Sequence, residues 1–239
     1  MFAAALALLN GCASLPHNGE VPNCERDGRT LRIKGPTDAR LVSCLDTAED
    51  IEIVEITSQG GSVRNAIEAG RKLRATGAAM VIVGYCESSC ANYLVPAAAN
   101  VRIAAGARIV LHGSVDAWAL ERGTTMELYA LQRDFAEENG ATPGWLMMRT
   151  GEDARSGRDG RFVTSDATDA DERGRSRYII VEPEFLASCL PMVRATWDAP
   201  LYTSQITASR DRLRRLAAQG FVLSGSMRCT PVQSYPAQP

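Results

Sequence analysis

Short apolar runs alternate along the chain with amphipathic stretches, as is typical of strand–helix units. Residues 51–56 alternate with a period of two, and 80–83 form a continuous apolar run that suits a buried strand. Between them, apolar residues recur at three- and four-residue steps from Val63 to Leu73, which predicts a helix that ends at Gly77. We therefore expect an α/β layered fold. The predicted elements are strands at about 30–34, 51–56, 80–83, 101–103, 108–111, 178–181 and 221–223, and helices at about 37–47, 62–77, 88–98, 124–140, 183–189 and 209–220.

The N-terminal segment has the features of an export signal, although no Lys or Arg precedes its apolar run. The run Phe2 to Leu9 leads into Leu-Asn-Gly-Cys, which resembles the lipobox of bacterial lipoproteins and makes Cys12 a candidate for lipidation. The alternative is a short apolar tail with no such role. Export predicts a periplasmic or otherwise extracytoplasmic protein, attached to a membrane if Cys12 carries lipid. The expected organisation is a signal and lipobox at 1–12, a tether at 13–23, one main domain at 24–190 and a C-terminal extension at 191–239.

Composition narrows the classes of function. The chain of 239 residues carries 26 Lys and Arg against 28 Asp and Glu, a net charge of −2. Binding to nucleic acid needs a basic excess to neutralise phosphates, so a nucleic-acid partner is not expected. No apolar run is long enough for a spanning helix. The segment 151–177 is charged, rich in glycine and nearly free of apolar residues, which predicts a long loop.

Three local features carry the candidate chemistry. Two glycines, Gly60 and Gly61, follow the strand at 51–56; Ser88 and Ser89 follow the next strand; and His112 ends the strand at 108–111. A serine at a helix N-terminus sits among unpaired backbone N–H groups and a partial positive charge. Paired glycines let backbone N–H groups approach an oxyanion, and a histidine can accept the proton of a serine. Together these residues predict acyl chemistry.

This constellation resembles the ClpP/crotonase superfamily, and in particular periplasmic Clp-protease-like proteins. The stretch Thr-Ser-Gln-Gly-Gly-Ser-Val at 57–63 is similar to the family's glycine motif. The stretch Cys-Glu-Ser-Ser-Cys-Ala at 86–91 is similar to a Cys-x-Ser-x-Cys-Ala motif of the periplasmic proteins. The stretch Arg-Ile-Val-Leu-His at 108–112 is similar to the strand that ends in the family histidine. The resemblance implies a serine peptidase with Ser88 as nucleophile, His112 as base, and the backbone N–H groups of Gly61 and Ser89 as oxyanion hole. It also implies a peptide or protein substrate and no cofactor, and leaves a homo-oligomer open.

Two positions depart from the family pattern. Gln59 replaces the proline that usually precedes the glycines, and Gly113 follows the histidine where Clp proteases usually have Gln-Pro. The third catalytic residue, an Asp well downstream, cannot be chosen from the sequence. The candidates share the charged segment and are Asp153, Asp159, Asp166, Asp169 and Asp171.

Seven cysteines are present, an odd number that becomes even if Cys12 is lipidated. Cys86 and Cys90 lie on either side of Ser88 in the sequence, and a disulfide between them would hold the turn rigid. A zinc site would need more ligands than these two cysteines and His112 provide. A cysteine nucleophile would suit only a reducing compartment. Proximity along the chain then favours two further disulfides. These candidate pairs are Cys24–Cys44 and Cys189–Cys229.

Three hypotheses for function remain. The first is an extracytoplasmic ClpP-like serine hydrolase or peptidase. The second is a crotonase-like acyl-CoA enzyme, which fits poorly with export. A catalytic site built on a Ser–Lys pair is disfavoured by the positions of Lys34 and Lys72. The third is a catalytically inactive ClpP-like scaffold or binding module of the cell envelope.

Overall fold

A computed structural model describes residues 23–111, 126–147, 176–199 and 220–223. A nine-stranded sheet runs through this part in the order β1-β2-β3-β4-β6-β7-β9, with β5 and β8 branching from β4. The strands are β1 (Asn23–Asp27), β2 (Thr30–Lys34), β3 (Ile53–Ser58), β4 (Ala79–Glu87), β5 (Asn100–Ile103), β6 (Arg108–Leu111), β7 (Ser176–Ile180), β8 (Arg194–Trp197) and β9 (Gly220–Leu223).

The centre of the sheet is parallel. β2 pairs with β3, and β3 with β4, in the same direction. The long strand β4 then forks: its first half, Met80 to Ile82, pairs with β5, while Tyr85 to Glu87 pair with β6. β1 and β7 are antiparallel to their neighbours β2 and β6. Because β3, β4 and β6 are parallel, their carboxyl ends meet at one edge of the sheet, where α/β proteins commonly hold ligands.

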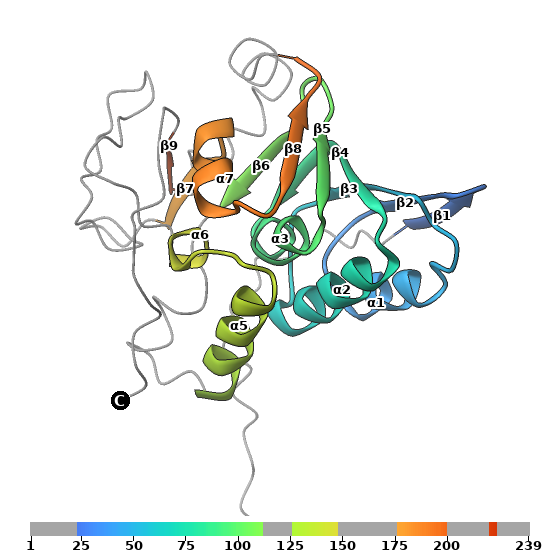
Figure 1. The fold of residues 1–239 in the computed structure, drawn as a ribbon, viewed down its shortest axis with the longest axis horizontal. Helices are drawn as coiled ribbons and strands as arrows, with labels where there is room; N and C mark the ends of the chain where they lie inside the picture. The colour runs from blue at the N-terminus through green and yellow to red at the C-terminus, as the bar shows by residue number, and fades with distance from the viewer. Residues whose placement is uncertain (1–22, 112–125, 148–175, 200–219, 224–239) are drawn as a thin grey trace, which may run out of the picture.

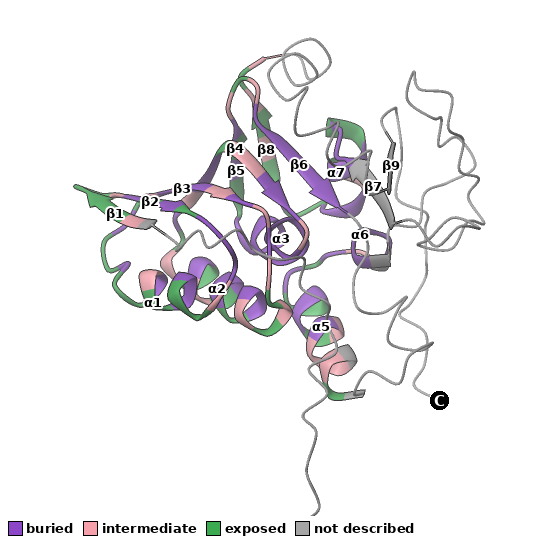
Figure 2. Ribbon diagram, turned by 180° about the vertical axis from the view of Figure 1, so that it is seen from behind, coloured by how far each residue is buried: buried purple, intermediate pink, exposed green. Residues whose placement is uncertain are grey.

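Helices cover one face of this sheet, as Figure 1 shows for α1, α2 and α5. Strand residues such as Val54, Ile56 and Ile82 are fully buried and belong to the same core cluster as Ile67 and Leu73 of α2. In Figure 2, β6 is coloured as buried along its length. Each such side chain contributes about 1.5–3 kcal/mol when it is fully buried. The helices are α1 (Ala39–Asp46), α2 (Val63–Thr76), the π-helical turn η1 (Cys90–Leu94), α3 (Val95–Ala97), α5 (Met126–Glu138), α6 (Pro143–Met147) and α7 (Pro183–Cys189).

Local sequence signals explain where the first two long helices begin and end. The carboxylate of Asp38 accepts the Arg40 N–H at 2.8 Å and caps α1. The Ser62 hydroxyl caps α2 by accepting the Asn65 N–H, and Gly77 ends α2 with a φ of +68°. Glycine suits this left-handed position because it has no Cβ.

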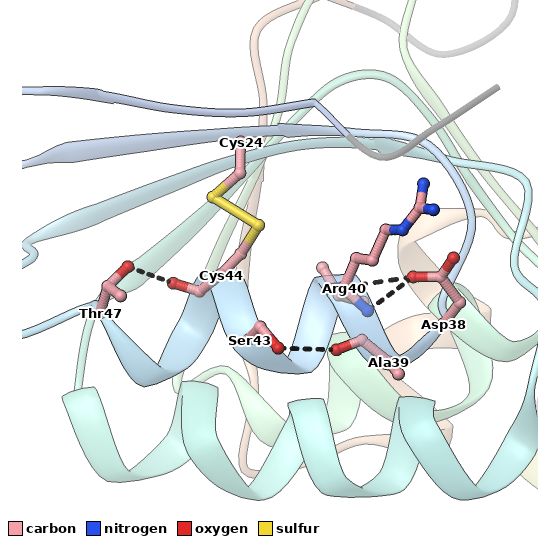
Figure 3. Close-up of a disulfide and its surroundings, with 8 residues drawn as sticks. Cys24, Asp38, Ala39, Arg40, Ser43, Cys44 and Thr47 are labelled. Carbon is pink, nitrogen blue, oxygen red and sulfur yellow. Dashed lines mark hydrogen bonds between the residues drawn. A yellow bond between two sulfur atoms is a disulfide. The ribbon is translucent and has the colours of Figure 1, made fainter.

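A disulfide between Cys24 and Cys44 joins β1 to α1, with the two Cα atoms 6.0 Å apart (Figure 3). Around it, the Ser43 and Thr47 hydroxyls donate to carbonyls of their own helix. The cross-link holds the first strand of the sheet against the helical layer.

The predicted α/β layering is confirmed. The predicted boundaries of the domain and of the C-terminal extension stay predictions, although β8 lies beyond residue 190 and pairs with β5. The sequence analysis missed β1, β8 and α6 because they are short and lack strong periodicity. The helix predicted at 209–220 and most of the loop predicted at 151–177 lie outside the described residues. No helix within the described ranges is both long and apolar enough to cross a membrane.

Candidate active site

The candidate site lies where β3, β4 and β6 end. Ser58 of β3 pairs with Cys86 of β4, and Cys86 pairs with Ile109 of β6, so the ends of the three strands lie side by side in register at this edge. β3 then leads into the two glycines, β4 into Ser88, and β6 into position 112. The parallel register therefore brings together the ends of three strands that are far apart in the sequence.

Ser88 occupies a sharp turn between β4 and η1. Its φ is +56°, and only one other described residue besides glycine, Asp50, has a positive φ. The Ser88 N–H donates to the Val110 carbonyl at 2.9 Å, and its own carbonyl accepts the Asn92 N–H at 2.8 Å. A left-handed backbone at serine costs about 1–2 kcal/mol. Such strain collects at functional sites, and a strand-to-helix turn of this kind presents a serine in the nucleophile elbows of hydrolases.

Gly60 packs directly against this turn. A Cβ added to Gly60 would lie 2.6 Å from the Glu87 carbonyl oxygen, 2.6 Å from the Ser88 Cβ and 2.8 Å from the Ser89 nitrogen. The φ of Gly60 is +86°, which also favours glycine. Only a residue without a side chain allows the loop after β3 to come this close to Ser88.

The backbone of this glycine loop is almost fully hydrogen-bonded. Gly60 donates its N–H to the Ser58 hydroxyl at 3.2 Å and accepts the Thr37 N–H at 3.0 Å. Ser62 donates to the Thr37 carbonyl at 2.9 Å. Between them, the Gly61 N–H donates to no residue of the described part of the chain. Because backbone donors in folded proteins are almost always paired, this amide stands out as one available to a ligand.

Ser89 supplies a second such amide. As the first residue of its helical turn it has no intrahelical partner for its N–H, and within the described ranges this N–H donates to nothing. Its side chain does not cap the helix. The Ser89 hydroxyl donates instead to the Gly61 carbonyl at 2.8 Å and is almost fully buried. Because this bond engages the Ser89 hydroxyl, Ser88 is the better candidate nucleophile of the two serines.

A buried ion pair braces the strand that carries Ser88. The Arg108 guanidinium lies 3.0 Å from the Glu87 carboxylate, and the two side chains are only 4% and 6% exposed. Arg108 also lies over the ring of Tyr85, 5.3 Å from its centroid. The pair links β4 to β6 just before both strands end, so it fixes the separation of the two strand ends.

Cysteines flank the serine as a closed disulfide. Cys86 and Cys90 are fully buried and bonded to each other, with Cα atoms 5.3 Å apart. The turn that carries Ser88 is thus cross-linked across four residues. All five cysteines of the described residues are disulfide-bonded, including Cys189, whose expected partner Cys229 lies outside them. No cluster of three metal-binding side chains occurs in the part of the chain that the structure describes.

Several predicted positions lie outside the described residues. His112 directly follows Leu111, the last residue of β6, in the sequence and lies outside the described residues, so its place at the site stays a prediction. Cys12 and Gly113 also lie outside the described residues. So do the candidates for the third catalytic residue: Asp153, Asp159, Asp166, Asp169 and Asp171.

The sequence analysis missed three contributors to the geometry. Thr37, Ser58 and the Glu87–Arg108 pair position the site. Ser58, Glu87 and Arg108 stand in the quoted motifs but were given no role there, and Thr37 stands in none of them. Thr37 follows Pro36 and precedes a helix cap, which looks like an ordinary helix start. Only its bridge to Gly61 shows a second role.

Known proteins resemble this chain in part of their structure. No family model matches the chain, and no curated protein matches it in sequence. Among solved structures, a ClpP1 mutant from Listeria monocytogenes is similar over 47% of this chain and 72% of its own, with 21% identity and a TM-score of 0.33. The ClpP protease catalytic domain from Plasmodium falciparum is similar over 47% of this chain and 66% of its own, with 14% identity and a TM-score of 0.36. Similarity this low marks a partial likeness to ClpP domains and does not bear on activity or assembly.

Proposed function

We propose that this protein is an extracytoplasmic serine hydrolase of the ClpP-like type that cleaves peptide bonds through an acyl-enzyme. One observation carries the proposal: the backbone amides of Gly61 and Ser89 have no partner among the described residues, and each directly follows one of two residues that pack on each other, Gly60 and the strained Ser88. Two convergent N–H groups beside a hydroxyl are what stabilises the oxyanion of acyl transfer.

The roles follow from this arrangement. Ser88 Oγ attacks the substrate carbonyl carbon as His112 takes its proton, and the N–H groups of Gly61 and Ser89 hold the resulting oxyanion. When the intermediate collapses, the peptide C–N bond breaks, His112 returns the proton to the leaving amine, and the acyl group stays on Ser88. Water, deprotonated by His112, then attacks the ester carbonyl; the bond to Ser88 Oγ breaks, His112 returns the proton to Oγ, and the acid is released. No third residue is assigned.

The extracytoplasmic location is part of the proposal and has separate support. Cys24–Cys44, Cys86–Cys90 and the bonded Cys189 agree with an oxidising compartment, because disulfides are rare where thiols are kept reduced. In this proposal, the segment before the sheet directs export, and a lipid on Cys12 anchors the protein to the membrane. Metabolic labelling with a lipid precursor, compared between the full chain and Cys12→Ala, tests the anchor.

A fluorophosphonate probe tests the chemistry. The purified protein with its disulfides intact should form one adduct, located at Ser88 by mass spectrometry, and Ser88→Ala should form none. His112→Ala should label at least about a hundredfold more slowly because the base is lost. Ser43→Ala is the matched control, since it removes an exposed hydroxyl remote from the site. A folded wild-type protein that stays unlabelled would rule out the hydrolase and leave the inactive scaffold as the better description.

A further inference from the structure

The hydroxyl of Ser89 has a partner that oxyanion binding by the Ser89 backbone does not require. It donates to the Gly61 carbonyl at 2.8 Å, across 28 residues of sequence, from a side chain that is 4% exposed. A serine at the start of a helix normally accepts from the helix's own N–H groups. Ser89 makes no such cap and bonds to the glycine loop instead.

The orientation of the Gly61 N–H depends on the peptide units on either side of its Cα. The unit between Gly60 and Gly61 is anchored by the Thr37 N–H, which donates to the Gly60 carbonyl at 3.0 Å. In a trans peptide the carbonyl and the N–H point in opposite directions, so this bond turns the Gly61 N–H away from Thr37. The next unit carries the Gly61 carbonyl and the Ser62 N–H. The Ser62 N–H donates to the Thr37 carbonyl at 2.9 Å, and on the opposite side the Ser89 hydroxyl donates to the Gly61 carbonyl.

The loop depends on anchors from its neighbours because glycine does not hold its own conformation. Gly60 and Gly61 have φ values of +86° and +154°, a combination that favours glycine and leaves the loop free to rotate unless its neighbours hold it. Thr37 presses on one side: a Cβ at Gly61 would lie 3.1 Å from the Thr37 carbonyl oxygen. Ser89 holds the other side, and it does so from the residue that also offers the second amide.

We propose that the Ser89 side chain is a positioning residue, whose hydroxyl fixes the Gly61 carbonyl and so aims the Gly61 N–H at the oxyanion. This inference rests on the proposed hydrolase function. The Ser89 hydroxyl touches neither substrate nor reacting atoms and takes no part in proton transfer. It couples the two amides of the oxyanion hole, so that the turn at Ser88 and the glycine loop move together.

Two measurements on Ser89→Ala, with Ser43→Ala as control, test the proposal. The first is deuterium uptake of the backbone at 58–62 by mass spectrometry, which needs no activity. Loss of the anchor should speed exchange in this segment by about tenfold while the rest of the sheet stays as in wild type. The second is hydrolysis of p-nitrophenyl butyrate. Here kcat should fall by about tenfold with KM within about twofold of wild type, since only oxyanion stabilisation is impaired.

The outcomes separate this inference from the proposed function. If wild type neither hydrolyses the ester nor reacts with the fluorophosphonate, the hydrolase fails, and the exchange measurement alone decides whether Ser89 anchors the loop. If wild type is active but Ser89→Ala matches it in exchange and in kcat, the positioning role fails and the hydrolase stands. A rise in KM at unchanged kcat also overturns the positioning role. An adduct on Ser89 itself overturns both.

Discussion

Replacing Gly60 by alanine tests the close approach on which the whole site depends. The matched control is Gly77→Ala. Both glycines have positive φ values, +86° and +68°, so both replacements impose a left-handed backbone on alanine. They differ in surroundings: a Cβ on Gly77 meets no atom within 4 Å, whereas one on Gly60 meets the backbone and Cβ of the Ser88 turn at 2.6–2.8 Å.

The structure sets the expected size of the two effects. A left-handed alanine costs about 1–2 kcal/mol, and this is all that Gly77→Ala should lose. Gly60→Ala adds the contacts with Glu87, Ser88 and Ser89, and the atoms it meets are mostly backbone that cannot rotate away. Overpacking of this kind costs about 1–3 kcal/mol more. Gly60→Ala should therefore lower the free energy of unfolding by about 2–5 kcal/mol.

Urea denaturation with the disulfides intact measures both variants, with stability compared at a common m-value. The same preparations are then reacted with the fluorophosphonate probe. Since the added methyl group pushes the loop away from Ser88, Gly60→Ala should label at least about tenfold more slowly, and Gly77→Ala should label like wild type. Equal midpoints for the two variants would show that the loop does not pack on the Ser88 turn as described, and the reasoning about the oxyanion hole would fail with it.

Two further predictions concern charged groups. Glu87→Gln removes the carboxylate that neutralises the buried Arg108, so it should lower the free energy of unfolding, measured in urea, by about 3–5 kcal/mol. The double variant Glu87→Gln with Arg108→Met should lose less stability than Glu87→Gln alone, because no buried charge remains. An equal or larger loss in the double variant would contradict this account. At the surface, a hydrogen bond from Arg102 holds the pKa of Asp198 below its ordinary value of 3.8. A lowered folded-state pKa means that this contribution to stability is complete above pH 3.8 and is lost as the pH falls through the folded pKa. Arg102→Gln should raise the pKa of Asp198 toward 3.8 in an NMR titration, and an unchanged value would remove Arg102 as the cause.

The alternation of apolar runs was enough to predict the layers, because burial requires one face of each helix and strand to be apolar. The helix 63–76 and its end at Gly77 were predicted closely, since periodicity and a left-handed glycine cap both act within a few residues. The pairing of β5 with β8 depends on contacts about 90 residues apart, which no local pattern records. β8 itself was missed because it is short and lacks strong periodicity.

The chain by itself determined which groups the site contains: the glycine pair, two serines between cysteines, and a histidine after a strand. These are chemical identities, and they can be read position by position. What those groups do to one another was decided by the tertiary structure alone. The parallel register of β3, β4 and β6 brings their ends level, Thr37 anchors Gly60, and the hydroxyl of Ser89 turns away from its own helix to the Gly61 carbonyl. Hydrogen-bond partners are determined by proximity in space. The amides of Gly61 and Ser89, which have no partner among the described residues, could therefore be identified only from the tertiary structure, which shows the partners of the neighbouring amides.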